Sequence, residues 1–368
     1  MGSPGPLARV SAGLPDFPWD LLQPAKTRAA THPDGLVDLS IGTPVDHVPA
    51  SVQRALAVAA DAPGYPATAG TAELRRALVD YLSRHCDAAL GEESVLPTIG
   101  SKELVAALPS QLGLRSGDRV VIPSVCYPTY EVGARLAGAS VVRADHPSEL
   151  SVEARLVWVN SPANPHGRVL SAAELRDWVA WARAHGAVLA SDECYLELGF
   201  ETSPVSALAP AVTQGVLTGV LAVHSLSKRS NLAGYRAGFV AGDPALVGEL
   251  LAVRKQAGLM VPAPVQAAMV AALGDAEHAV AQRAIYAARR SLLRPALEAA
   301  GLRIDDSQAG LYLWATRGEA CWSTVDWFAA RGILVAPGDF YGPTGASHVR
   351  LALTATDERI AAAAARLR

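Results

Sequence analysis

Short apolar runs alternate with helical patterns along most of the chain. Apolar residues at helical spacing predict helices over residues 48–60, 71–85 and 102–112. Short, mostly apolar runs predict strands at 95–99, 119–123, 155–159, 187–191 and 220–224. Because strands that alternate with helices form parallel sheets, we expect an α/β fold with a mostly parallel sheet flanked by helices.

The pattern changes after residue 262. Two long helices are predicted over 264–273 and 276–300, followed by short strands at 311–315, 332–336 and 348–353 and by a terminal helix. This order indicates a second, smaller α+β domain, which the N-terminal segment completes. We therefore expect a large domain over residues 45–262 and a small domain formed by residues 1–44 and 263–368.

Composition narrows the kind of function. The 368 residues are 50% hydrophobic and 18% charged, and the formal charge of -3 gives no broad attraction to nucleic acid or to an anionic membrane. A small-molecule site is favoured. The chain has no signal-like N-terminus and no apolar run of about eighteen residues, so we expect a soluble, cytoplasmic protein. The four cysteines are widely spaced, which argues against a metal site or a disulfide framework.

Several polar residues follow the predicted strands directly. In open α/β sheets, ligands bind at the carboxyl ends of the strands, on the loops that follow them. The residues in these positions are Ser101, Tyr127, Asn164, Asp192 and Lys228.

The most specific segment is SLSK (225–228), followed by Arg236. Ser225 and Arg236 can converge on one phosphate, through a hydroxyl and a two-pronged guanidinium group. A lysine amine beside a phosphate clamp is what covalent attachment of pyridoxal phosphate (PLP) requires, and Lys228 supplies that amine. Without these partners, a lysine among small residues would suit a solvated loop equally well.

Asp192 and Tyr195 form a second group, directly after the strand at 187–191. Asp192 could cap the next helix, which is a common role for aspartate. Alternatively it could pair with the protonated pyridine nitrogen of PLP, while the Tyr195 phenol points at the ring oxygen O3′.

Three further segments suit the same cofactor. Asn164, in a Pro/Asn/Gly turn, can donate to O3′ and to a substrate carboxylate. The free N–H groups of Ser101 and Lys102 start a helix and can bind the phosphate. Tyr127 can stack on the pyridine face, or it is simply a buried aromatic residue.

Arg350 lies in an otherwise apolar strand of the small domain. A buried arginine is costly unless it is paired. A substrate α-carboxylate is a suitable bidentate partner, and a structural salt bridge is the alternative.

Taken in order, these motifs resemble the fold type I PLP-dependent aminotransferases, in the branch that includes aspartate and aromatic aminotransferases. The resemblance runs from about Asp38 to the C-terminus. It implies that Lys228 is the Schiff-base lysine and that the phosphate and ring are held by Ser101, Lys102, Ser225, Arg236, Asp192, Tyr195, Asn164 and Tyr127.

The same resemblance implies a substrate site and a homodimer. Arg350 and the backbone of Gly42 would bind the substrate carboxylate. Tyr65 would reach the phosphate in the neighbouring subunit. The implied reaction is a ping-pong amino transfer in which Lys228 acts as general base and acid.

Within the family, stretches such as LPDFPWD, DLSIGTPVD and SDECYLELGF are similar to actinobacterial succinyldiaminopimelate aminotransferases. This implies transfer from glutamate to N-succinyl-2-amino-6-oxopimelate in lysine and diaminopimelate biosynthesis. His166 stands where the family has threonine and could reshape the edge of the cofactor site. The sequence identifies no residue for the distal succinyl or carboxylate group.

Three alternatives remain open at this point. The chain could be another aminotransferase, of aspartate, aromatic or alanine type. It could be a PLP-dependent C–S lyase, which would use nearly the same residues. A transcription regulator with an aminotransferase-like sensor would need a DNA-binding module, and only about forty residues precede the matched region.

Overall fold

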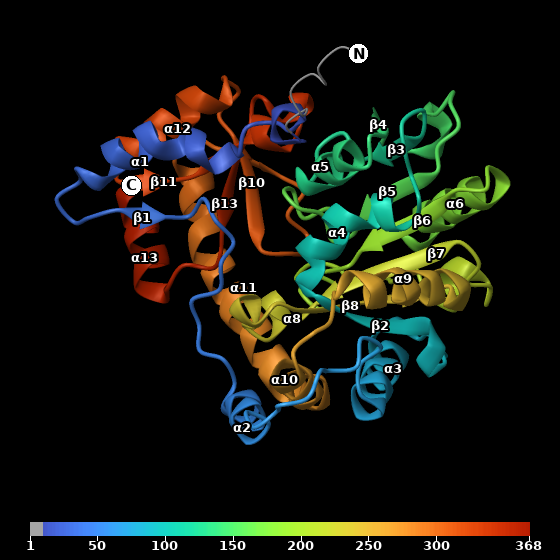
Figure 1. Ribbon diagram of the computed structural model, residues 1–368. Helices are drawn as coiled ribbons and strands as arrows, with labels where there is room; N and C mark the ends of the chain where they lie inside the picture. The colour runs from blue at the N-terminus through green and yellow to red at the C-terminus, as the bar shows by residue number, and fades with distance from the viewer. Residues whose placement is uncertain (1–9) are drawn as a thin grey trace, which may run out of the picture.

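Seven strands pair side by side in the larger of the sheets in the computed structural model, which describes residues 10–368 (Figure 1). Their order is β2 (Val95–Ile99), β8 (Ala237–Gly242), β7 (Val220–Ser225), β6 (Val188–Asp192), β5 (Leu156–Asn160), β3 (Arg119–Ile122) and β4 (Ser140–Arg143). Within this sheet only β8 runs antiparallel to its neighbours. The expected α/β fold with a mostly parallel sheet is confirmed.

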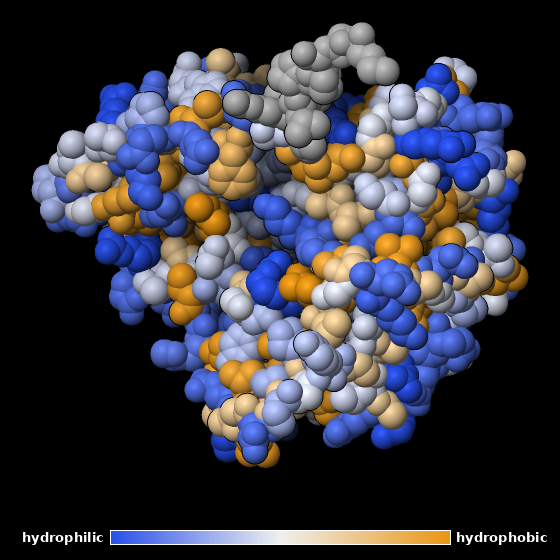
Figure 2. Space-filling view, viewed as in Figure 1, coloured by the Kyte–Doolittle hydropathy of each residue, from blue (hydrophilic) through white to orange (hydrophobic). Residues whose placement is uncertain are grey.

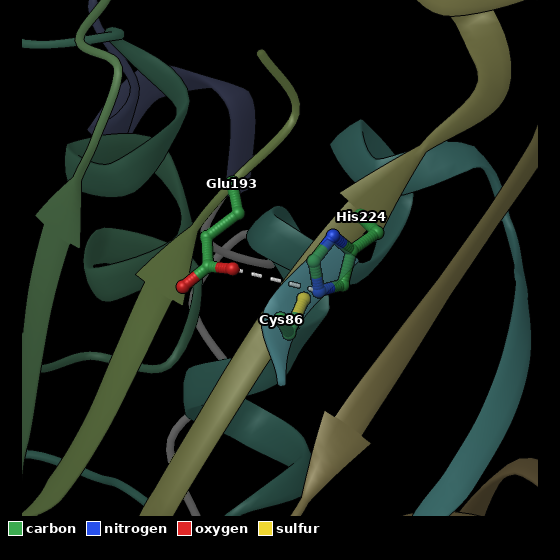
Figure 3. A group of neighbouring side chains, drawn as sticks. All are labelled: Cys86, Glu193 and His224. Atoms are coloured by element: carbon green, nitrogen blue, oxygen red, sulfur yellow. Dashed lines mark ion pairs between the residues drawn. The ribbon is translucent and has the colours of Figure 1, made fainter. Parts of the chain in front are cut away.

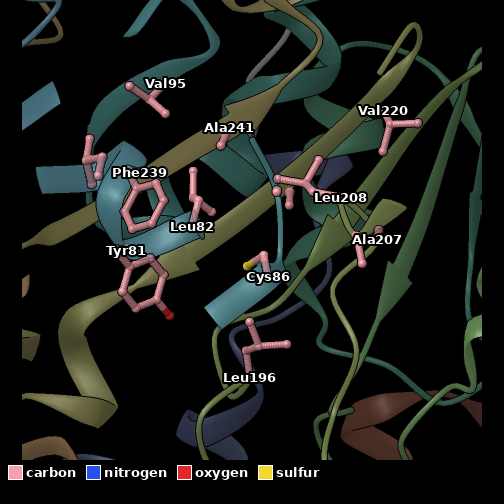
Figure 4. Packing of buried hydrophobic residues seen from close by; sticks show 14 of the residues in the cluster. Tyr81, Leu82, Cys86, Val95, Leu196, Ala207, Leu208, Val220, Phe239 and Ala241 are labelled. Carbon is pink, nitrogen blue, oxygen red and sulfur yellow. The ribbon is translucent and has the colours of Figure 1, made fainter. Parts of the chain in front are cut away.

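Helices cover both faces of this sheet because alternate strand residues point to opposite sides. Val157 and Leu189 face one cluster, to which the Leu74 and Leu78 stripe of α3 (Ala72–Cys86) belongs. In Figure 4, Tyr81, Leu82 and Cys86 pack beside Phe239 and Ala241 in this cluster. Leu156 and Trp158 face the other cluster, on the side of α4 (Gly100–Gln111), α5 (Thr129–Leu136) and α9 (Pro244–Ala257).

Helix starts in this region follow ordinary capping chemistry. Thr71 accepts a hydrogen bond from the Leu74 N–H and opens α3. Ser171 and Glu174 form a capping box at the start of α6 (Ala172–Ala184). The remaining helices of this half are α2 (Ala50–Val58), α7 (Pro210–Thr213), α8 (Leu226–Arg229) and α10 (Ala263–Gly274).

A second, antiparallel sheet has the order β12 (Ala336–Pro337), β13 (Val349–Ala352), β10 (Tyr312–Thr316) and β9 (Arg303–Asp305). Its hydrophobic cluster includes residues of α11 (Ala276–Ala299), α12 (Cys321–Ala329), α13 (Asp357–Arg366) and the N-terminal α1 (Gln23–Ala30). β1 (Val37–Asp38) pairs in parallel with β11 (Ile333–Leu334). The single strand predicted over 332–336 is therefore wrong: β11 and β12 pair with different strands on either side of Val335.

The division into domains at residues 44/45 and 262/263 remains a proposal, which the two sheets support. α10, which this boundary assigns to the small domain, packs instead in the cluster of the large sheet, through Ala268, Met269, Ala272 and Leu273. Residues 1–9 of the proposed small domain lie outside the described residues. Among residues 10–368, none of the helices combines the length and the apolar character that crossing a membrane would require.

Candidate active site

A cavity of about 320 Å³ lies where the loops after β5, β6 and β7 meet the second sheet. Figure 2 shows the viewed face hollowed near its centre, with strongly hydrophilic side chains along the hollow. Of the twelve site residues predicted from the sequence, the cavity brings together Gly42, Ser101, Lys102, Tyr127, Asn164, Asp192, Tyr195, Ser225, Lys228, Arg236 and Arg350. The missing residue is Tyr65, which is 98% exposed and lies elsewhere.

Lys228 reaches the cavity from the short helix α8. Ser225 opens this helix, since its hydroxyl oxygen lies 3.1 Å from the Ser227 N–H that it accepts. The Lys228 Nζ donates to the Gly42 carbonyl. Burial lowers the pKa of Lys228, and the positive charges of Arg350 and Arg236 act in the same direction. The lowered pKa makes loss of the proton easier, and the neutral amine is the form that can bond covalently and accept protons.

Asp192 ends β6 with its carboxylate buried. Oδ2 accepts from the Tyr130 hydroxyl at 2.8 Å, and Oδ1 accepts from the Cys194 N–H at 3.1 Å. No basic side chain of residues 10–368 forms an ion pair with it, and burial raises its pKa. The alternative interpretation, a helix cap, does not hold, because a turn and not a helix follows Asp192. The contact with the Cys194 N–H closes this turn and leaves the carboxylate without a cationic partner. A cation bound in the cavity would supply the missing partner.

The opposite end of the cavity suits an anion. Helix α4 begins here, and no side chain caps its first N–H groups at Ile99. Gly100 must be glycine, since its φ is +71° and a Cβ would lie 2.5 Å from Nη2 of Arg236. In the part of the chain that the structure describes, no carboxylate pairs with Arg236. Arg236, Ser225 and the Ser101 backbone together form a cradle for a phosphate group.

Arg350 lies in the middle of β13 and is 2% exposed. Nη1 donates to Asn164 Oδ1 at 3.0 Å and Nη2 to the Ser40 carbonyl at 2.6 Å, while Nε is buried without a partner. The Tyr312 ring centroid lies 4.0 Å from the guanidinium carbon. No salt bridge to Arg350 exists among residues 10–368, so the alternative of a structural salt bridge is not what the structure has. The guanidinium is available to a carboxylate ligand.

Two tyrosines complete the part of the cavity predicted from sequence. The Tyr195 and Tyr312 hydroxyl oxygens lie 3.3 Å apart. Burial raises the pKa of Tyr195 well above its usual range, so its phenol stays protonated and can donate a hydrogen bond. Tyr127 lines the cavity with its ring edge-on to Tyr130, and burial raises its pKa to about 12.

Several cavity or supporting residues were not identified from the sequence, among them Tyr130, Tyr312, Phe17 and Trp19. The sequence indicated Tyr130 only through its position three residues after Tyr127. His166 does not line the cavity; its Nδ1 lies 3.6 Å from Asp306 Oδ2, and burial lowers its pKa. The expectation that it could reshape the cofactor site is not supported by this position.

Behind the cavity, on the other face of the sheet, Glu193, His224 and Cys86 form a buried group (Figure 3). Glu193 Oε1 accepts from Ser191 and from the Ala207 N–H, and Oε2 lies 3.6 Å from His224 Nε2. Burial raises the pKa of Glu193 to about 7 and lowers that of His224 to about 3. The 3.6 Å contact is not a hydrogen bond, since Glu193 Oε2 and both ring nitrogens of His224 are buried without a hydrogen-bond partner among residues 10–368.

Comparison with known proteins decides the family. Residues 34–367 match the profile of aminotransferase class I and II. The chain belongs to this family. It is therefore an aminotransferase, and its cofactor is PLP, as the sequence predicted.

Similar proteins cover nearly the whole chain. A probable aminotransferase of Mycobacterium tuberculosis is 62% identical over 97% of this chain and 86% of its own. The 4-dedimethylamino-4-oxo-anhydrotetracycline transaminase of Streptomyces rimosus is 60% identical over 96% of this chain and 99% of its own. The structure of a probable N-succinyldiaminopimelate aminotransferase from Thermus thermophilus superimposes with a TM-score of 0.87, at 29% identity over 95% and 98% of the two chains.

The cavity fits PLP at both ends. The uncompensated Asp192 carboxylate suits a protonated pyridine nitrogen, and the cradle at Arg236 suits the phosphate. The buried Lys228 amine lies in the same cavity, as covalent attachment of the aldehyde requires.

Proposed function

We propose that this aminotransferase moves an amino group from glutamate to N-succinyl-2-amino-6-oxopimelate, reversibly, in lysine and diaminopimelate biosynthesis. The observation that carries the proposal is a spare cation in the cavity, the ammonium group of Lys102. Its Nζ lies 5.7 Å from the Phe17 ring centroid, and among residues 10–368 it has no ion-pair partner. An acceptor with a second, distal carboxylate would satisfy it.

The roles of the site residues follow from their surroundings. When bound, PLP supplies an aldehyde that binds amines and a ring that withdraws electrons from the substrate Cα. We assign Lys228 as the amine that holds the cofactor and moves the proton at Cα. Asp192 keeps the pyridine nitrogen protonated, and the Tyr195 phenol donates to the ring oxygen.

The substrate carboxylate and the cofactor phosphate have separate cationic sites. We assign the phosphate to Arg236, Ser225 and the N–H groups of Ser101 and Lys102. The α-carboxylate is assigned to Arg350, with the Asn164 amide and the Gly42 backbone beside it. This leaves the Lys102 side chain, on the Phe17 side of the cavity, for the distal end of the acceptor.

The likeness to the Thermus thermophilus protein supports this substrate class. A second candidate function is amination of a polycyclic ketone, which the 60% identity to the Streptomyces rimosus transaminase favours. The aromatic rings of Phe17 and Trp19, 5.5 Å apart at the cavity, would suit such an acceptor. Both candidates use the same amino donor, but a polycyclic ketone has no α-carboxylate for Arg350 to bind, so the two acceptors differ at that site as well as beyond the reacting carbon.

We also propose a homodimer in which Tyr65 reaches the phosphate of the neighbouring subunit. Tyr65 is 98% exposed in the single chain, so its side chain is free to contact a neighbouring subunit.

The test is a glutamate-dependent assay of the purified holoenzyme with four acceptors: N-succinyl-2-amino-6-oxopimelate, 4-dedimethylamino-4-oxo-anhydrotetracycline, oxaloacetate and phenylpyruvate. The proposal predicts the highest kcat/KM for the succinylated acceptor. Lys102→Met should lower that value by about 10-fold, the order expected for one charge-assisted contact. Preference for the tetracycline precursor would favour the second candidate, and preference for oxaloacetate or phenylpyruvate would refute both. Release of pyruvate and ammonia from cystathionine without an acceptor would indicate a lyase.

A further inference from the structure

The segment 40–46 connects three parts of the site. It follows β1 and runs beside α11 and α8 toward α2 (Figure 1). Arg350 Nη2 donates to the Ser40 carbonyl at 2.6 Å, and the Lys228 amine donates to the Gly42 carbonyl. The backbone of this segment therefore touches both the carboxylate-binding cation and the reactive amine.

The backbone at Gly42 lies close against Tyr312, which leaves no room for a side chain. A Cβ at this position would lie 2.2 Å from the Tyr312 hydroxyl oxygen. Thr354 Oγ1 also donates to the Ile41 carbonyl at 3.2 Å. The small sheet thus holds the first half of the segment.

Its other end is held by one carboxylate, Asp46. Arg289 of α11 donates to both oxygens, from Nη2 to Oδ1 at 2.5 Å and from Nη1 to Oδ2 at 2.9 Å. Gln282 Nε2, also on α11, donates to Oδ2 at 2.8 Å. Arg289 is 4% exposed in its side chain and Asp46 18%, so this bidentate pair is shielded from water.

The same helix holds the chain just after Lys228. Asn231 has a φ of +57°, and its Nδ2 donates to Gln282 Oε1 at 2.7 Å and to the His47 carbonyl at 3.2 Å. The Tyr286 hydroxyl lies 3.4 Å from the Lys228 carbonyl oxygen. Gln282 therefore links Asp46 directly to the loop that follows Lys228.

We propose that Asp46 is a positioning residue for amino transfer: by fixing segment 40–46 and the loop after Lys228 to α11, it keeps the Gly42 carbonyl at the Lys228 amine and the Ser40 carbonyl at Arg350. The inference rests on the roles proposed above for Lys228 and Arg350. It does not depend on which acceptor the enzyme uses.

The test compares Asp46→Asn with the matched control Asp357→Asn in the holoenzyme. Asp357 also pairs with Arg289, through Nε at 2.7 Å, but its side chain is 74% exposed. Two quantities are measured in each: kcat/KM for glutamate in the half-reaction, and the pH midpoint of the visible absorbance of bound cofactor, which reports protonation of the Lys228 nitrogen. Asp46→Asn should lower the first by about 10-fold and move the midpoint by roughly half a pH unit or more, while Asp357→Asn stays near the parent.

Thermal stability separates a positioning role from a purely structural one. If Asp46→Asn loses stability while kcat/KM and the midpoint stay at parent values, the inference is wrong. Gln282→Met keeps the Asp46–Arg289 ion pair and removes the hydrogen bonds of Gln282 to Asp46 and Asn231, so it serves if Asp46→Asn does not fold. It should move the midpoint in the same direction, and a parent midpoint would overturn the inference. Neither measurement involves the acceptor. A wrong assignment of the acceptor would therefore leave both results unchanged, and it can be told apart from a wrong role for Asp46.

Discussion

Replacing Arg350 with lysine tests the carboxylate site at one position. The substitution keeps the positive charge and removes the planar fork. Nη1 and Nη2 now satisfy Asn164 and the Ser40 carbonyl at 3.0 and 2.6 Å. A single ammonium at this buried position cannot meet both acceptors and a bidentate carboxylate.

The cost follows from this geometry. Losing one charge-assisted hydrogen bond to the substrate carboxylate costs about 1.5–3 kcal/mol, which corresponds to about 10- to 100-fold in kcat/KM. The whole loss should be specific to the α-carboxylate. An amino donor without an α-carboxylate makes no ion pair with Arg350, so its kcat/KM should change little in Arg350→Lys.

The assay is the half-reaction measured with two amino donors, glutamate and glutamate 1-amide. We expect Arg350→Lys to reduce the preference for glutamate by about 10- to 100-fold. Arg294→Lys is the control, because this arginine forms exposed ion pairs with Glu201 and Glu298. An equal slowing of both donors in Arg350→Lys, or an unchanged preference, would show that Arg350 does not bind the α-carboxylate.

Two further predictions concern neighbouring carboxylates. Asp192→Asn should bind PLP but slow the half-reaction with glutamate at least about 10-fold, because an amide cannot compensate the pyridinium charge. Stopped-flow absorbance measures this rate. A rate equal to that of the parent would contradict the pairing of Asp192 with the pyridine nitrogen. Glu193 has a pKa of about 7 in the folded chain, against an ordinary value of 4.5. Between these pH values the folded chain binds more protons than the unfolded chain, so its free energy of unfolding falls as the pH rises from 4.5 through 7. Glu193→Gln lacks this titration, so between pH 5 and pH 8 its free energy of unfolding should rise relative to the parent by about 2 kcal/mol. Urea unfolding at the two pH values measures it, and a constant difference would refute the shifted pKa.

Much of the large sheet could be predicted from the sequence because its central strands are short apolar runs. The strands at β2, β3, β5, β6 and β7 were found within one or two residues. β4 and β8 were not predicted. The β8 sequence AGFVAG consists mostly of small residues and carries little strand signal. The sequence also did not predict which strands pair with one another. The segment 332–336, for example, divides into β11 and β12, which pair with different strands.

Site residues could be predicted from the sequence where a reactive or charged side chain directly follows a recognisable strand. Asp192 and Lys228 are of this kind, and the cavity contains both. Tyr130 was not predicted because its contribution is a hydrogen bond to Asp192, which lies 62 positions later in the sequence. The role of Asp46 depends likewise on α11, more than 230 residues later, and no local pattern indicates that contact.

Attachment of the cofactor to Lys228 is the central claim, and peptide mapping tests it most directly. The holoenzyme is reduced with borohydride, digested, and analysed by mass spectrometry for the added mass of the reduced cofactor. We predict that this mass lies on the peptide that contains Lys228 and that Lys228→Ala carries none. Its presence on Lys26, Lys102 or Lys255, or an unmodified Lys228 in active enzyme, would contradict the account.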